Sequence, residues 1–181
     1  MRTLATALIA SCILFAGLPA CSTAPKSAQG RSELDADVAK AMDQFRKGDA
    51  AIDAFITKAH GYAIFPTVGK GAVGIGGAYG KGEVFEKGRK IGYCDLTQAT
   101  IGLALGGQAY SELICFENEP ALTRFKTGNF AFAAQASAVA LKSGASAQAK
   151  YSDGVAVFTC GEGGLMYEAS IGGQKFSYKP E

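Results

Sequence analysis

The sequence predicts an α+β fold, in which two N-terminal helices precede a glycine-rich, antiparallel β core that forms a barrel or sandwich. Apolar residues recur at helical spacing over residues 31–60, whereas from residue 61 onward short apolar segments alternate with glycine-rich breaks. Of the 24 glycines, 13 lie between Gly61 and Gly107. Glycine inside strands permits twist and close approach of another backbone, so this density favours a tightly curved sheet.

The helical region is expected to contain two helices. One apolar face is predicted for the first of them, formed by Leu34, Val38, Ala41, Met42 and Phe45. Ser32 is the expected N-cap, with Asp35 at the capping-box position, and residues 52–59 predict a second, shorter helix. The polar face mixes basic and acidic side chains, which favours helices that cover a sheet over helices that lie on a membrane surface.

The β region contains several short candidate strands. They are expected at residues 63–65, 72–79, 82–86, 90–98, 100–106, 109–116, 154–159, 165–171 and 176–179, with a weakly alternating, alanine-rich segment at 130–141. Pro66 is expected to stop the first strand, and Gly80 and Lys81 to turn a hairpin. One short helix is expected near 119–127, ended by Gly128.

The N-terminus has the pattern of an export signal. Residues 4–18 are apolar, which is shorter than the roughly 20 residues that a spanning helix needs, so residues 1–20 are interpreted as a signal peptide. Leu18-Pro19-Ala20-Cys21 is similar to a bacterial lipobox, which predicts lipid attachment to Cys21. The polar residues 21–30 would then be a flexible tether, and residues 31–181 a single domain. A plain secreted protein is the alternative.

Charge and composition argue against several classes of function. Removal of Arg2 with the signal peptide leaves 17 of the 18 basic residues against 16 acidic ones, which is no basic excess for nucleic acid. His60 is the sole histidine and no cysteine has a CxxC partner, so a zinc site is not expected. No other metal or cofactor is expected either. Cys94, Cys115 and Cys160 permit at most one disulfide, and their spacing does not indicate which pair. No catalytic motif is present, so we expect no enzyme.

The segment Gly69-Lys70-Gly71-Ala72-Val73-Gly74 satisfies the dinucleotide pattern GxGxxG. That pattern binds a pyrophosphate only where it follows a strand and opens a helix. The next residues, IGGAYGKGEVF, contain too much glycine for a helix. The glycines are therefore interpreted as architectural.

Three segments together resemble the SYLF domain family: GYAIFPTVGKGAVGIGGAYGKGEVF, IGYCDLTQATIGLALGGQAYSELICFENEPALTRFKTGNFAF and GLMYEASIGGQKFSYKP. The resemblance covers residues 58–179 and implies the family's fold and an affinity for membrane phospholipid. Eukaryotic members bind phosphoinositides and some bind actin, whereas bacterial members are small exported proteins or lipoproteins. The chain has no tryptophan, where the eukaryotic pattern has one near residues 91–94. Actin binding is not expected in an exported protein.

A phospholipid site requires an apolar groove and cations for the headgroup phosphate. The candidate headgroup residues are Lys58, Lys70, Lys81, Arg89 and Lys90. The alternative is that these are solvent-exposed turn residues that only keep the hairpin tips soluble. A second set of side chains is unusually polar for glycine-rich strands and predicts a buried network if it points into the β core: Asp95, Thr97, Gln98, Gln108 and Glu112.

The function expected from the sequence is that of a non-catalytic, phospholipid-binding lipoprotein of the bacterial envelope, facing the periplasm. Ser22 follows the candidate lipidated cysteine and is not aspartate, which suggests the outer membrane. The alternative is a structural lipoprotein that presents a β-rich surface to envelope proteins.

Overall fold

The computed structural model describes residues 23–71, 76–100, 109–128, 130–132, 138–161 and 171–181. The fold is α+β, as predicted. Its elements are α1 (Ala28–Gly48), α2 (Ile52–Lys58), β1 (Gly61–Gly71), β2 (Gly76–Glu86), β3 (Arg89–Thr100), β4 (Ala109–Phe116), α3 (Glu119–Lys126), β5 (Val139–Ala140), α4 (Ala145–Gln148), β6 (Val155–Gly161) and β7 (Gln174–Pro180).

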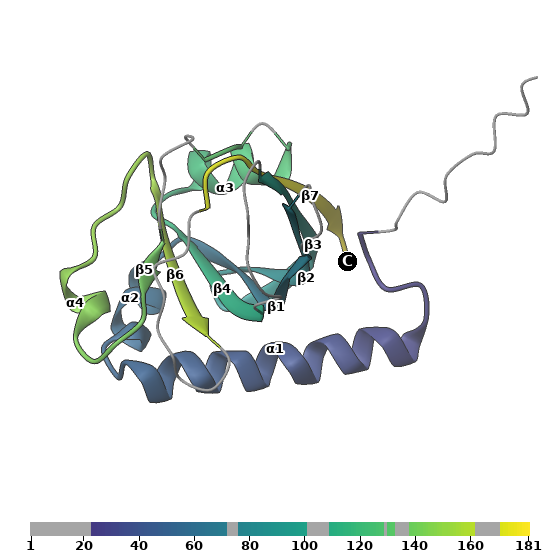
Figure 1. Ribbon diagram of the computed structural model, residues 1–181. Coiled ribbons are helices and arrows are strands. Elements are labelled where there is room, and N and C mark those ends of the chain that lie inside the picture. Colours follow the sequence, from purple (N-terminus) through teal and green to yellow (C-terminus); the bar gives the residue numbers. More distant parts are fainter. Residues whose placement is uncertain (1–22, 72–75, 101–108, 129, 133–137, 162–170) are drawn as a thin grey trace, which may run out of the picture.

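The described strands form one seven-stranded sheet in the order β5-β6-β4-β1-β2-β3-β7. All pairs are antiparallel except β5 with β6. The sheet curls without closing, because among these strands no ladder joins β7 to β5 (Figure 1). The core is therefore an open, curled sheet rather than a complete barrel, and β6 and β7 flank the β1–β4 strands on opposite sides.

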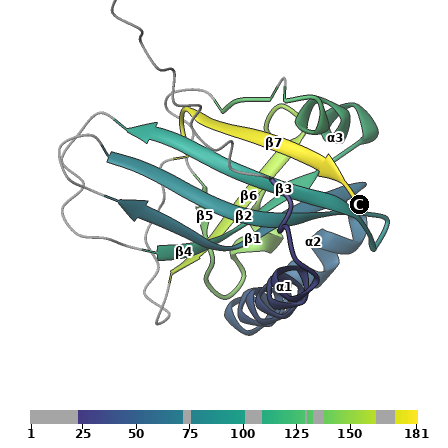
Figure 2. The same cartoon turned by 90° about the vertical axis from the view of Figure 1, so that its right-hand side faces the viewer.

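Helices cover both faces of the sheet. We call the side that packs against α1 and α2 the α1 face, and the opposite side, which packs against α3, the α3 face (Figure 2). Strand alternation sorts the side chains, so that in β4 Leu113 and Cys115 join the α1 face while Ile114 and Phe116 join the α3 face. The α3 face carries an aromatic cluster in which the Phe125 ring lies 5.0 Å from the ring of Phe116 and 5.0 Å from that of Phe176.

The first helix begins earlier than predicted. Ser27, not Ser32, is the N-cap, and its Oγ accepts a hydrogen bond of 3.0 Å from the backbone N–H of Gly30. Ala24 is 7% exposed and packs in the core of the α1 face. The segment 21–30 was expected to be a flexible tether. Instead, Ala24 is part of the core, and residues 28–30 belong to the first turn of α1. The five predicted apolar residues of this helix are all buried, as expected: Leu34, Val38, Ala41, Met42 and Phe45.

Two predicted breaks in the first strands are wrong. Pro66 does not end β1; the pairing of β1 with its neighbours shifts register around it, because proline lacks the N–H that a regular ladder needs. Gly80 and Lys81 do not turn a hairpin but lie inside β2, paired with β1 and β3. The hairpin between β2 and β3 turns instead at Lys87 and Gly88, both of which have positive φ (49° and 77°), as a type I′ turn requires.

The glycines of the first strands have a packing role. A Cβ at Gly82 would overlap the backbone carbonyl oxygen of Ile64 and lie 2.9 Å from a ring carbon of Phe65. Gly69 and Gly71 belong to β1 and pair with Tyr79 and Gly77 of β2, so the start of the GxGxxG string is strand. The end of that string, at residues 72–74, lies outside the described residues.

The later elements follow the prediction more closely. β4 and α3 have the predicted bounds to within a residue, and Gly128 ends α3 with a φ of 70°. Only Val139–Ala140 of the weakly alternating segment 130–141 is assigned to a strand among the described residues. The strands predicted at 100–106 and 165–171 fall almost wholly outside the described residues.

Candidate functional site

The five predicted headgroup cations do not gather in one place. Lys58 is exposed at the end of α2, and Arg89 is exposed at the start of β3. Lys81 is half-buried within β2, and the side chain of Lys70 lies outside the described residues. Lys90 is largely buried and engaged in ion pairs. No common phosphate site is formed by these residues as the structure describes them.

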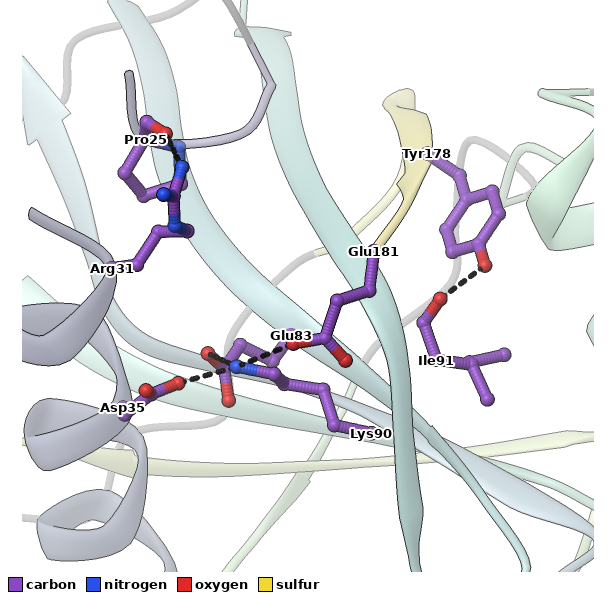
Figure 3. Close-up of polar contacts among 8 residues, drawn as sticks. All are labelled: Pro25, Arg31, Asp35, Glu83, Lys90, Ile91, Tyr178 and Glu181. Atoms are coloured by element: carbon purple, nitrogen blue, oxygen red, sulfur yellow. Dashed lines mark hydrogen bonds and ion pairs between the residues drawn. The ribbon is translucent and has the colours of Figure 1, made fainter. Parts of the chain in front are cut away.

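Lys90 is the centre of a cluster on the α1 face (Figure 3). Its Nζ lies 2.6 Å from the Oδ1 of Asp35 in α1, 3.3 Å from the Oε1 of Glu83 in β2 and 3.6 Å from the Oε1 of Glu181. The same ammonium lies 5.0 Å from the centroid of the Tyr93 ring. This cluster ties the first helix to two strands and to the end of β7.

Glu83 is the most unusual group of the cluster, since its side chain is only 2% exposed. Burial, reinforced by the neighbouring carboxyl of Asp35, raises the pKa of Glu83 to about 7, although Lys90 opposes the shift. A hydrogen bond from Glu83 and the ammonium of Lys90 lower the pKa of Asp35. Glu83 therefore titrates near neutral pH, whereas Asp35 remains ionised there.

Two of the predicted network residues lie together on the α3 face. Glu112 is fully buried, and its Oε2 accepts a hydrogen bond of 3.0 Å from the Nε2 of Gln174. Gln98 stands opposite Gln174 in the β3–β7 ladder and donates to the carbonyl of Gly172 at 2.8 Å. The Nε2 of Gln174 also lies 3.5 Å from the hydroxyl of Tyr110. A buried polar network exists here, with a membership that differs from the prediction.

The remaining predicted members do not join it. Asp95 and Thr97 alternate with Gln98 along β3, so they point to the α1 face; Asp95 is buried and Thr97 is exposed. Gln108 lies outside the described residues.

Sequence reasoning missed two contributors to this network, Gln174 and Tyr110, neither of which was singled out. The alternation of Gln174 with two later apolar positions of β7 was the available signal, because it assigns the glutamine side chain to the core. Burial and the nearby carboxylate of Glu112 raise the pKa of Tyr110 strongly, so its hydroxyl stays protonated and can donate.

An apolar pocket of about 300 Å³ opens beside β6. Its apolar lining includes Phe130, Phe132, Val157 and Ile171. Its polar lining is Lys150, Ser152 and Asp153; the Asp153 carboxylate pairs with Arg124 at 3.1 Å, while Lys150 is exposed. The volume is at the lower end of the range for small-molecule sites, and the lining suits an aliphatic chain.

The groups that could support catalysis are dispersed. The Nε2 of His60 lies 2.9 Å from the Oε1 of Glu86, and no cysteine is among its hydrogen-bond partners in the described part of the chain. Cys94, Cys115 and Cys160 are free thiols, and burial raises the pKa of each. Among the described residues no group of three histidine, cysteine, aspartate or glutamate side chains is placed to hold a metal ion.

No helix within the described ranges is both long and apolar enough to cross a membrane. The predicted lipid-attachment residue, Cys21, lies outside these ranges, so its modification stays a prediction.

The chain is similar to Beta cell expansion factor A of Aeromonas veronii, with 32% identity over 120 residues. The match covers 66% of this chain and 46% of that protein, so the chain spans about half the length of the curated relative. No family model matches the chain, and the resemblance to the SYLF family therefore stays a prediction.

Proposed function

We propose that this protein is a SYLF-type, phospholipid-binding module of the bacterial cell envelope, non-catalytic and held to the outer membrane by lipid on Cys21. The observation that carries the proposal is the apolar pocket beside β6, which could accommodate an acyl chain. The sequence pattern at residues 1–21 supports the anchor, since it predicts export followed by lipid attachment.

The pocket has the two chemical parts that a phospholipid needs. Phe130, Phe132 and Ile171 offer aromatic and aliphatic surface to an acyl chain, whose burial is favourable by roughly 0.8 kcal/mol per methylene. Lys150 lines the same pocket, and among the described residues no carboxylate pairs with it. An ammonium beside an apolar slot suits a lipid whose phosphate remains at the surface.

Native mass spectrometry of the full-length protein, extracted from membranes in a neutral detergent, tests both halves of the proposal. We expect an added mass of a diacylglycerol thioether on Cys21, and its loss in Cys21→Ser. We also expect a non-covalent phospholipid on the wild type. Ala131→Trp should reduce that adduct, because Ala131 lines the pocket and is exposed at its surface.

Ala54→Trp is the matched control, since Ala54 is exposed on α2 and does not line the pocket. It should leave the phospholipid adduct unchanged. Lipid that binds Ala131→Trp as well as the wild type would refute the pocket, and a protein without any bound phospholipid would refute lipid binding. In the latter case, crosslinking in cells that captures one envelope protein stoichiometrically would favour the interaction role.

A further inference from the structure

A second pocket, of about 550 Å³, lies where the chain enters α1, against the ends of β3 and β7. It is distinct from the apolar pocket in its lining residues and in its charge. Three of its side chains are basic, Lys26, Arg31 and Lys179, and one is acidic, Glu181. None of these cations was among the headgroup residues predicted from the sequence.

The basic side chains of this pocket are available for an anion. Among the described residues, no carboxylate lies within 4.0 Å of the charged groups of Lys26, Arg31 or Lys179. Within the described ranges, the guanidinium of Arg31 makes one hydrogen bond, from its Nη1 to the carbonyl oxygen of Pro25 at 3.4 Å, which leaves other guanidinium N–H groups to donate.

The neighbouring carboxylates are occupied by another cation. Figure 3 shows Lys90 between Asp35, Glu83 and Glu181, separate from the Arg31–Pro25 contact. Lys90 thus partly neutralises Glu181, the one acidic side chain of the pocket lining, and it draws Asp35 toward the sheet. The lining keeps a positive balance because Lys90 takes up this negative charge.

The position of the pocket along the chain indicates the source of the anion. Ala24, the first residue of the lining, is three residues beyond Cys21. Three residues span at most about 10 Å even when fully extended. If Cys21 carries the anchoring lipid, the pocket is therefore held at the surface of the bilayer, within reach of phospholipid headgroups.

We propose that this pocket binds the phosphate of an anionic phospholipid headgroup in the membrane that holds the anchor. The inference rests on the proposed function, because it requires lipid on Cys21. Arg31 donates paired N–H groups to the phosphate oxygens, and Lys26 and Lys179 supply point charges beside it. The contact orients the domain on the bilayer, so that the start of α1 and the end of β7 face the headgroups.

The test uses the full-length, lipid-modified protein with the substitution Ala131→Trp, which removes the contribution of the apolar pocket. It is placed in neutral-detergent micelles that contain either phosphatidylglycerol or phosphatidylethanolamine, and native mass spectrometry counts the bound lipid. We expect phosphatidylglycerol to be preferred. The added pair Arg31→Gln and Lys179→Gln should weaken its binding by about thirtyfold, as expected for two basic residues at an anionic surface.

The control pair Lys58→Gln and Arg89→Gln removes two exposed cations outside the pocket and should leave the preference intact. Equal binding of the two lipids, or an undiminished preference in Arg31→Gln/Lys179→Gln, would overturn the proposal. Complete displacement of phosphatidylglycerol by inorganic phosphate would assign the pocket to free phosphate and overturn the lipid source. Failure of the proposed function is recognised separately in the wild-type protein, by the absence of the Cys21 thioether and of lipid in the apolar pocket.

Discussion

The two faces of the sheet bury carboxyl groups by different means. On the α1 face, Glu83 lies 3.3 Å from the ammonium of Lys90 and shares a cluster with Asp35. On the α3 face, Glu112 is fully buried and accepts a hydrogen bond from the neutral amide of Gln174. Glu83 therefore lies within a cluster of charged groups, whereas Glu112 lies beside the neutral amide of Gln174.

This difference predicts which kind of change will alter the stability of each face. The α1 face carries a titratable cluster that joins a helix to the sheet, so its stability depends on pH. The α3 face is stabilised by packed aromatic rings, so its stability depends on the absence of cavities among them. The three predictions below separate these contributions.

The largest effect is expected from Phe125→Ala on the α3 face. Phe125 is fully buried against Phe116, Phe130 and Phe176, and its truncation leaves a cavity at the centre of that cluster. We expect a loss of about 3–5 kcal/mol in the free energy of unfolding, measured by urea denaturation. Phe55→Ala, which removes a half-buried ring on the α1 face, should cost less. An equal loss of unfolding free energy in the two variants would contradict the proposed difference between the two faces.

A smaller effect is expected in the sheet itself, from Gly82→Ala. Its new methyl group would overlap the carbonyl oxygen of Ile64, so either β1 or β2 must shift, at a cost of about 1–3 kcal/mol in unfolding free energy. Gly69→Ala is the matched control, because its methyl group would meet no atom within 4 Å. Thermal unfolding of both variants should show a lower melting temperature only for Gly82→Ala; a comparable loss in Gly69→Ala would refute the close-approach explanation.

The smallest effect is expected in the pH dependence of the α1 face. The folded state raises the pKa of Glu83 to about 7 from its ordinary value of 4.5, so between these values it keeps a proton that the unfolded chain releases. The free energy of unfolding should therefore fall as the pH rises through this window. Glu83→Gln should flatten that fall in urea titrations at about pH 5 and about pH 8.

Glu33→Gln serves as the control for this titration, since Glu33 is exposed on α1 and its carboxylate accepts a hydrogen bond from the neighbouring Gln29 rather than from the cluster. It should keep the wild-type pH dependence. A slope that survives in Glu83→Gln would assign the titration to another group.

The periodic features of this fold could be predicted from the sequence. The apolar face of α1 was correct at every position because a helix buries residues at a spacing set by its own geometry. β4 and α3 were correct because strong local signals bound them. The hairpin at Gly80 and Lys81 was wrong because glycine marks both turns and tight strand packing, and only the partner strand distinguishes the two.

The candidate sites were predicted less well, for a related reason. Gln98 and Glu112 are buried on the α3 face, but Gln174, which donates to Glu112, comes from a strand 62 residues later in the chain. Both pockets are also formed by segments that are distant in the sequence; for example, Arg31 and Lys179 line the same pocket. Local patterns indicate which face a side chain occupies, but not which remote segment lies over it.

The positions of β6 and β7 have a consequence for the order of folding. Among the described strands, β6 pairs with β4 and β7 pairs with β3, so these two late strands join opposite sides of the β1–β4 strands, with β5 outside β6. Before β6 and β7 pair, β4 and β3 are edge strands, and the α3 face lacks the apolar side chains that β6 and β7 contribute. Pairing between strands that are distant in the sequence slows folding, so we expect this domain to refold from urea more slowly than a helical domain of similar length.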